Sequence, residues 1–225
     1  MSKSIISKKI LLWYDNNKRI LPWRKNSSKE QKLYYTLVSE FMLQQTQVST
    51  VIPYFKKFVQ KITNLKKLSK IKDQTLMKLW EGLGYYSRAR NLKKSAIMIV
   101  DRFGGILPSN FDDLKSLPGV GDYTSTAIMA IAFNKKFIPL DGNVERILKR
   151  VLYLRNEKDI SKENMQISKN FFGLSERPSD YAQAIMELGA LVCRPTSPLC
   201  EKCPISINCI SYKRKDFSLI KKIKR

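Results

Sequence analysis

The sequence contains no histidine and few acidic residues, since 19 Asp and Glu stand against 42 Lys and Arg in 225 residues. Without an imidazole the chain cannot form a Ser-His-Asp triad, a histidine proton relay or a histidine-containing zinc site, so any catalysis is left to carboxylates, Tyr, Lys or Cys. The net charge of +23 indicates a polyanionic partner, most simply nucleic acid, with an anionic membrane surface as the alternative.

Long apolar runs are also absent. No uninterrupted stretch of the sequence approaches the ~18 residues of a membrane-spanning helix, and the basic N-terminus lacks the apolar segment and cleavage site of a secretory signal. We therefore expect an intracellular, nucleoid-associated protein with no membrane partner. With 43% hydrophobic residues, a chain of this length can bury a core without disulfides.

Apolar residues recur at helical spacing, whereas strand-like alternation is hard to find. Such stripes run through residues 6–13, 85–103 and 181–192, and Gly, Pro and Asn separate them. Ser109 to Asp112 is typical of a helix N-cap, opening a short helix that ends at Pro118. The sequence predicts an all-α protein with about ten helices.

The four cysteines lie close together near the end of the chain, as Cys193, Cys200, Cys203 and Cys209. Buried thiols rarely gather in this way, so a four-thiolate metal site is favoured, holding either zinc or a [4Fe-4S] cluster. The spacing Cys-x6-Cys-x2-Cys-x5-Cys resembles the iron–sulfur loop of the endonuclease III superfamily of DNA glycosylases. This resemblance implies one [4Fe-4S] cluster that holds a cationic loop, residues 193–209, against DNA.

A glycine hairpin joins two predicted helices at Leu117, Pro118, Gly119, Val120 and Gly121. Two glycines two apart allow a tight turn and the close approach of a ligand, and the following helix directs its positive end there. Alone, the pattern is usually only a turn. In this basic chain it resembles the helix-hairpin-helix element of the same superfamily, which binds backbone phosphate; we therefore predict DNA contacts at Leu117, Gly119, Val120 and Gly121.

Two carboxylates are candidates for catalysis. Hydrolysis of an N-glycosidic bond needs one acid to protonate the leaving base and one carboxylate to face the developing oxocarbenium ion. Glu40 lies among apolar neighbours, where burial would favour its protonated form. Asp141 follows an apolar run and precedes a predicted helix. From the residues alone, an exposed helical Glu and a helix N-cap remain the ordinary alternatives.

Three further segments resemble the signatures of MutY-type adenine DNA glycosylases: residues 39–48 (SEFMLQQTQV), 82–92 (GLGYYSRARNL) and 140–144 (LDGNV). With the hairpin and the cysteine loop they occur in family order over nearly the whole chain. The resemblance implies that Glu40 protonates adenine and assists water. It also implies that Asp141 stabilises the oxocarbenium ion, with Asn143 as its neighbour at the flipped nucleotide.

The resemblance also assigns DNA contacts. Gln45 and Tyr85 match residues that fill the base stack near the lesion, and Gln44 and Thr46 match residues that flank the opposite base. These side chains would offset the few kcal/mol that base extrusion costs. Arg88 in the same motif is predicted to contact DNA, whereas Tyr86 is predicted to belong to the helix core.

Tyr123 bears on the reaction type. Bifunctional members of the superfamily carry a Lys nucleophile two residues after the last hairpin glycine, and here that position holds Tyr123. A hydroxyl favours hydrolysis without strand cleavage. Mismatch thymine glycosylases that act on G:T pairs can also carry Tyr there and remain an alternative, disfavoured by residues 43–47 and 140–143.

We therefore expect a two-lobed helix-hairpin-helix DNA glycosylase fold with a [4Fe-4S] cluster loop. Residues 28–136 would form a helical barrel lobe, and residues 1–27 with 137–225, including the basic tail, would form the second lobe, with the DNA cleft between them. The expected partner is duplex DNA with A:8-oxoguanine or A:G mispairs, bound by a monomer. The resemblance leads us to expect that the family's C-terminal domain, which recognises 8-oxoguanine, is not part of this sequence, with weaker discrimination for the oxidised base as the consequence. A non-catalytic DNA-binding iron–sulfur protein is the other alternative.

Overall fold

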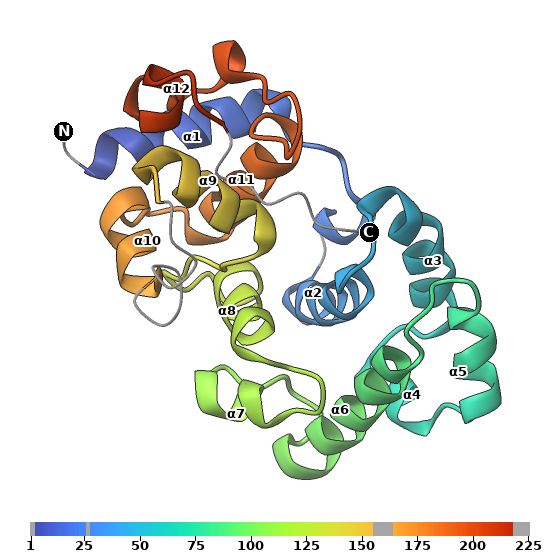
Figure 1. Ribbon diagram of the computed structural model, residues 1–225. Helices are drawn as coiled ribbons and strands as arrows, with labels where there is room; N and C mark the ends of the chain where they lie inside the picture. Colours follow the sequence, from blue (N-terminus) through green and yellow to red (C-terminus); the bar gives the residue numbers. More distant parts are fainter. Residues whose placement is uncertain (1–2, 26–27, 155–163, 218–225) are drawn as a thin grey trace. The chain divides into compact units, whose positions relative to one another are not determined.

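The computed structural model describes residues 3–25, 28–154 and 164–217. Within these residues the backbone forms twelve α-helices and short 3-10 turns, with no strand, which confirms the predicted all-α class. The chain divides into two compact units (Figure 1). Ile20–Phe133 forms one, here called the inserted unit, and Met1–Arg19 with Asn134–Arg225 forms the other, the terminal unit. No helix of the described residues is long and apolar enough to cross a membrane.

The inserted unit is built around a buried central helix. Its helices are α2 (Lys29–Leu43), α3 (Val48–Lys61), α4 (Leu65–Lys70), α5 (Asp73–Trp80), α6 (Ser87–Phe103), α7 (Phe111–Ser116) and α8 (Asp122–Ile131). Helix α2 contacts α3, α6 and α8, and its side chains Leu37 and Phe41 are fully buried. The fully buried ring of Trp80 packs edge-on against Phe58, with ring centroids 6.1 Å apart. Burial of α2 on several sides positions the residues near its C-terminus.

The short helix before the hairpin begins as predicted. The Asn110 side chain accepts a hydrogen bond from the main-chain N–H of Asp113 at 2.8 Å, which is N-capping. Helix α7 ends at Ser116, and α8 starts at Asp122 after the glycine turn. The two helices pack against each other, so the turn between them is held at both ends.

The terminal unit joins the first helix of the chain to its last third. It contains α1 (Lys3–Asn17), α9 (Gly142–Leu152), α10 (Asn164–Phe172), α11 (Pro178–Leu191) and α12 (Ile210–Lys213). Helix α1 packs on α10 and α11, and α9 packs on α11 and α12. Ile10, Ile147 and Leu188 belong to the shared core. Arg19 binds the buried carboxylate of Glu187 through Nε at 2.9 Å and Nη2 at 2.7 Å, which fixes the end of α1 to α11.

Tyr86 does not belong to the core as predicted, because its side chain is 40% exposed. The apolar stripe was extended too far towards the N-terminus, since α6 begins only at Ser87. Gly82 and Gly84 have positive φ angles and turn the chain just before it. Both tyrosines of the motif therefore precede the helix, and the buried stripe starts at Ala89.

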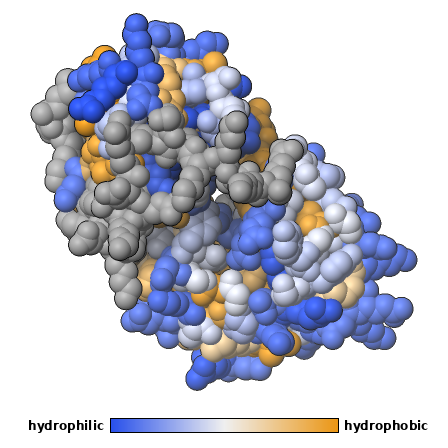
Figure 2. Space-filling view, viewed as in Figure 1, coloured by the Kyte–Doolittle hydropathy of each residue, from blue (hydrophilic) through white to orange (hydrophobic). Residues whose placement is uncertain are grey.

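The surface is mostly hydrophilic on the face shown in Figure 2, where apolar side chains form small separate patches. Exposed lysines are frequent along α3 and α4, including Lys56, Lys57, Lys66, Lys67 and Lys70. A polar, cationic surface of this kind suits a phosphate backbone better than an apolar partner. The final basic residues, 218–225, lie outside the described residues.

Candidate active site and cysteine pocket

Glu40 lies in the last turns of α2 and is only 6% exposed. The Tyr123 hydroxyl donates a hydrogen bond to Oε2 of Glu40 at 3.2 Å. Tyr123 belongs to the first turn of α8, directly after the glycine hairpin. The structure therefore brings together the two candidate catalytic residues of the inserted unit, although 83 positions separate them in the sequence. The alternative of an exposed helical Glu40 does not hold.

The hairpin is a tight turn closed by a hydrogen bond from the Val120 N–H to the Leu117 carbonyl at 3.0 Å. Gly119 has a φ of +80°, and a Cβ added there would lie 2.8 Å from the Cβ of Asn91, so a glycine is required. The side chains of Leu117 and Val120 are buried, so only their main chain is available for the predicted DNA contact. Gly121 is exposed and forms the N-cap of α8 without a side-chain cap, as suits an anion site.

Gln45 and Tyr85 share an uncommon backbone conformation, with φ angles of 55° and 48°. Side chains other than glycine rarely adopt this left-handed region. Both residues are exposed, Tyr85 by 61%. Strained residues of this kind gather at functional loops, which agrees with their predicted insertion into the base stack.

Gln44 and Thr46 lie on either side of Gln45 and are half-buried. The Gln44 amide donates to the Gly119 carbonyl at 3.2 Å, and the Thr46 hydroxyl lies 3.4 Å from the Gln44 carbonyl. The loop after α2 is therefore tied directly to the hairpin.

Arg88 is buried instead of lying on the surface. It is 6% exposed, and its guanidinium donates only to main-chain carbonyls, those of Phe41, Met42, Gln44, Leu83 and Gly84. This placement favours a positioning role over the direct DNA contact expected from the sequence.

Asp141 is the N-cap of α9. This is the structural role that the sequence offered as the alternative to catalysis. Its Oδ1 accepts from the N–H groups of Asn143 at 3.0 Å and Val144 at 2.7 Å, and its Oδ2 accepts from the Asn143 amide at 2.8 Å. Burial raises the pKa of the Asp141 carboxyl, and these three hydrogen bonds oppose the shift. The cap fixes the carboxylate rigidly beside Asn143, so N-capping and a catalytic role are compatible.

Arg146 is a residue that the sequence analysis missed. It donates to the Asn143 side-chain oxygen at 2.7 Å, to the Cys193 carbonyl at 2.7 Å and to the Gly189 carbonyl at 2.6 Å. Gly189 also permits the close packing of α11 against Asn143, because a Cβ there would lie 2.6 Å from the Cβ of Asn143. The one available signal was a glycine inside a predicted helix, which often marks a close contact.

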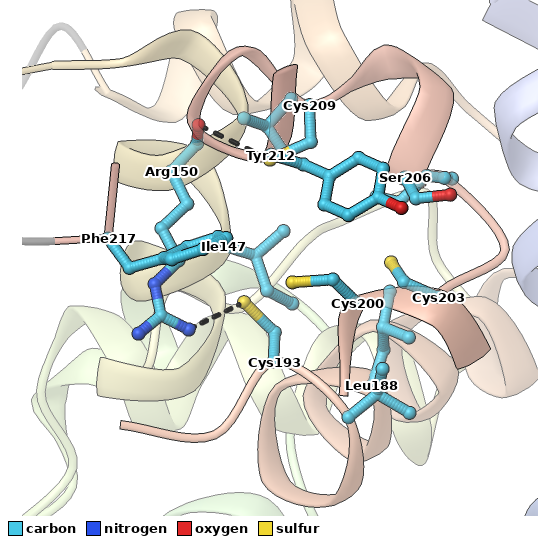
Figure 3. A pocket seen from close by; sticks show the side chains of 13 residues that line it. Ile147, Arg150, Leu188, Cys193, Cys200, Cys203, Ser206, Cys209, Tyr212 and Phe217 are labelled. Carbon is cyan, nitrogen blue, oxygen red and sulfur yellow. Dashed lines mark hydrogen bonds between the residues drawn. The ribbon is translucent and has the colours of Figure 1, made fainter. Parts of the chain in front are cut away.

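All four cysteines line one pocket of the terminal unit, together with apolar side chains of α9 and α11. Figure 3 shows the thiols of Cys193, Cys200 and Cys203 directed into this pocket, beside Cys209. None of the four forms a disulfide. Burial raises the pKa of the Cys203 thiol to about 12 and also raises the pKa of Cys200 and Cys209. Four thiols that line one pocket without forming a disulfide suit the ligation of a metal centre.

A buried arginine lines the same pocket. Arg150 is 2% exposed, and its guanidinium donates to the Cys193 sulfur at 3.3 Å and to the Arg194 carbonyl at 2.7 Å. Its Nε has no hydrogen-bond partner among the described residues, and none of their ion pairs includes it. A buried cation of this kind suits an anionic group in the pocket.

Known proteins are similar to this chain in sequence and in fold. A family model described as HhH-GPD superfamily base excision DNA repair protein matches residues 38–172. Adenine DNA glycosylase of Mus musculus is 41% identical over 216 residues, which are 91% of this chain and 41% of the mouse protein. Adenine DNA glycosylase of Buchnera aphidicola subsp. Schizaphis graminum is 38% identical over 96% of this chain and 62% of its own length. The resemblance found in the motifs is thus confirmed, and the chain spans two fifths to three fifths of these relatives.

Solved structures give the same result for the fold. A thermostable thymine-DNA glycosylase superposes with a TM-score of 0.84 at 27% identity, over 94% of this chain and 97% of its own. Endonuclease III in a non-covalent DNA complex superposes with a TM-score of 0.74 at 22% identity, over 96% and 98% of the two chains. The predicted glycosylase fold is confirmed. With its hairpin and the matched residues 38–172, the chain belongs to the HhH-GPD superfamily of base excision DNA repair proteins.

Proposed function

We propose that this chain hydrolyses the N-glycosidic bond of adenine mispaired with guanine or 8-oxoguanine in duplex DNA. The observation that carries the proposal is the buried Glu40, held by the Tyr123 hydroxyl at 3.2 Å beside the glycine hairpin. A protonatable group in that position, in a chain 41% identical to an adenine DNA glycosylase, suits the protonation of a base extruded from the duplex.

The proposed reaction uses two carboxyl groups in turn. Glu40 gives its proton to the adenine, and the glycosidic bond breaks with its electron pair leaving on the base. Asp141, ionised and rigidly capped, stabilises the positive charge of the oxocarbenium ion on the sugar. Glu40, now a carboxylate, takes a proton from the attacking water, which forms the new bond to the sugar carbon. The products are free adenine and an abasic site, and Glu40 is protonated again.

Tyr123 supports hydrolysis without a covalent intermediate. A Schiff base to the sugar requires an amine, whereas the side chain next to Glu40 is a phenol. Its hydroxyl donates to the Glu40 carboxylate and so orients the group that transfers the proton. We therefore propose a monofunctional glycosylase.

The DNA contacts fall on three loops of the inserted unit. The proposed phosphate contacts are the main-chain N–H groups around Gly119 and Gly121, at the positive end of α8. Gln45 and Tyr85 are proposed to enter the base stack, which fits their exposure and their left-handed backbone. Gln44 and Thr46 would then lie beside the opposite base.

We also propose one [4Fe-4S] cluster on Cys193, Cys200, Cys203 and Cys209. When bound, the cluster would supply a rigid cross-link for the loop and no step of the hydrolysis. Arg150, which forms no ion pair among the described residues, would offset the net negative charge of a cluster held by four thiolates. The spacing of the four cysteines along the sequence resembles that of an iron–sulfur loop, which favours the cluster over one zinc.

The test is a single-turnover reaction of the purified protein on an A:8-oxoguanine duplex, with A:G in parallel. We expect an abasic product from the wild type and none from Glu40→Gln, which keeps the shape of the side chain but cannot give a proton. Duplex binding by Glu40→Gln should be unchanged. Binding without any excision by the wild type would instead identify a non-catalytic DNA-binding protein.

Excision of thymine from G:T pairs is the second candidate function. It is favoured by the 27% identity and the TM-score of 0.84 with a thymine-DNA glycosylase. A G:T duplex included in the same experiment separates the two functions, and borohydride trapping detects any covalent intermediate. Excision of thymine but not of adenine would transfer the proposal to this substrate.

A further inference from the structure

Arg88 is a buried cation in the first turn of α6 that joins two loops distant in the sequence. Its Nη1 donates to the Met42 carbonyl at 2.7 Å and also to the carbonyls of Phe41 and Gln44. Its Nη2 donates to the carbonyls of Leu83 and Gly84, both at 3.1 Å. One planar guanidinium thus fixes the end of α2 with one nitrogen and the loop between α5 and α6 with the other.

The end of α2 explains why a cation lies there. The last carbonyls of a helix have no partner within the helix and carry its negative pole. At α2 the Phe41 and Met42 carbonyls belong to that last turn, and the chain continues through Gln44 without a capping glycine. Arg88 supplies the missing donors. None of the ion pairs of the described ranges includes Arg88, so carbonyl dipoles and two aromatic rings surround its charge.

The two loops joined in this way present the exposed, left-handed residues Gln45 and Tyr85. The Arg88 guanidinium carbon lies 5.4 Å from the centroid of the Tyr85 ring and 5.7 Å from the centroid of the Trp80 ring. Gln44 extends the connection, since its main chain accepts from Arg88 and its side chain donates to the hairpin at Gly119. One buried side chain therefore holds all three loops that are proposed to face DNA.

We propose that Arg88 is a positioning residue that holds Gln45 and Tyr85 at the separation needed for both to enter the base stack. The inference rests on the proposed function, because it assigns these two residues to base extrusion. It does not require adenine to be the excised base. A neutral side chain at position 88 would leave five carbonyls without their shared donor. The two loops would then no longer be connected through one side chain.

The test measures base extrusion separately from chemistry. Arg88→Met and Arg88→Lys are compared with the wild type on a duplex with 2-aminopurine at the target position, whose fluorescence rises when the base leaves the stack. Methionine removes every hydrogen-bond donor. Lysine keeps the positive charge but has only one nitrogen, so it cannot donate to both loops in the way that Nη1 and Nη2 of arginine do. We expect extrusion to slow about ten-fold or more, since a misplacement of ~1 Å can cost about a hundred-fold. Arg102→Met, which removes an exposed arginine of the same helix, is the matched control and should extrude normally.

A double-mutant comparison separates positioning from general stability. In a Gln45→Ala, Tyr85→Ala protein the wedge residues are absent, so Arg88→Lys should slow the remaining extrusion by less than about two-fold, because coupled sites are non-additive. An equal fold-change in both backgrounds, or normal extrusion by both Arg88 variants, would overturn the proposal. Loss of folding by both variants would also overturn it and assign Arg88 to stability. Normal extrusion by the wild type without adenine release would instead count against the proposed function alone.

Discussion

The Arg146 guanidinium donates a 2.7 Å hydrogen bond to the main-chain carbonyl of Cys193, the first cysteine of the pocket. The same guanidinium donates to the side chain of Asn143, which in turn donates to the Asp141 carboxylate. A chain of three hydrogen bonds therefore joins the cysteine loop to the candidate catalytic carboxylate. Because charged hydrogen bonds are the stronger ones, a change in the loop is expected to move Asp141.

Arg146→Gln should weaken this connection while α9 remains folded. Loss of a hydrogen bond to a charged group costs roughly 1.5–3 kcal/mol, so we expect single-turnover excision to slow by about ten-fold or more. Duplex affinity should change little. Lys149→Gln is the control, since it removes only a partly exposed pair with Glu145 on the same helix. Equal rates for the two variants would show that the loop and Asp141 are independent.

Two substitutions of Asp141 should distinguish its catalytic role from its role as the N-cap of α9. Asp141→Asn keeps an oxygen that accepts from the N–H groups of α9 but removes the charge, so excision should be lost while the free energy of unfolding stays within about 0.5 kcal/mol. Asp141→Ala should lose excision and also about 1 kcal/mol of stability. Urea unfolding and single-turnover assays measure the two effects. An active Asp141→Asn protein would contradict the catalytic role.

The rate should fall at low pH because burial raises the pKa of Asp141 above that of an ordinary aspartate. Only the ionised carboxylate can stabilise the oxocarbenium ion. This stabilisation is lost when Asp141 becomes protonated as the pH falls through its raised pKa. The hydrogen bond from Asn143 favours the ionised form, so Asn143→Ala should move the acidic limb of the pH–rate profile to higher pH. A limb that stays in place or moves to lower pH would contradict this assignment.

The two hairpin glycines should respond differently to alanine. At Gly119 a Cβ would lie 2.8 Å from Asn91 and 3.0 Å from Phe41, on a backbone with φ +80°. We expect Gly119→Ala to cost about 1–3 kcal/mol of stability and to weaken duplex binding. At Gly121 nothing lies within 4 Å of the added Cβ. Gly121→Ala is therefore the matched control for stability, with a loss of only about 0.5–1 kcal/mol because the N-cap preference is small. Thermal unfolding and salt-dependent duplex titration measure both variants.

Local patterns predicted much of the fold and several site residues. Helical periodicity predicted the all-α class, and the capping signal at residues 109–112 predicted the start of α7, whose N-cap is Asn110. Cysteine spacing predicted that Cys193, Cys200, Cys203 and Cys209 come together in one pocket. In each case the residues of the pattern lie within about twenty positions of one another. Over such short stretches the local geometry of the backbone limits where the side chains can lie.

The roles that the sequence did not reveal are those of two arginines that bind main-chain atoms far away in the chain: Arg88 was predicted to contact DNA, and Arg146 was not predicted at all. Arg88 binds carbonyls up to 47 positions distant, and Arg146 binds a carbonyl 47 positions distant. A main-chain carbonyl is present at every residue, so no sequence pattern marks the partner of such an arginine. The error at Tyr86 had a different cause, because glycines at positive φ stopped the helix before an apolar stripe that seemed continuous.

The pairing of Arg19 with Glu187 spans 168 positions and has a consequence for the order of biosynthesis. The first helix leaves the ribosome well before α11, the helix on which it packs, has been made. Residues Ile20–Phe133 can meanwhile complete their own core during translation. Until synthesis passes Glu187, the apolar face of α1 at Ile6, Ile10 and Tyr14 has no native partner on α11. A nascent chain halted before that point would expose this face to chaperones and to neighbouring chains.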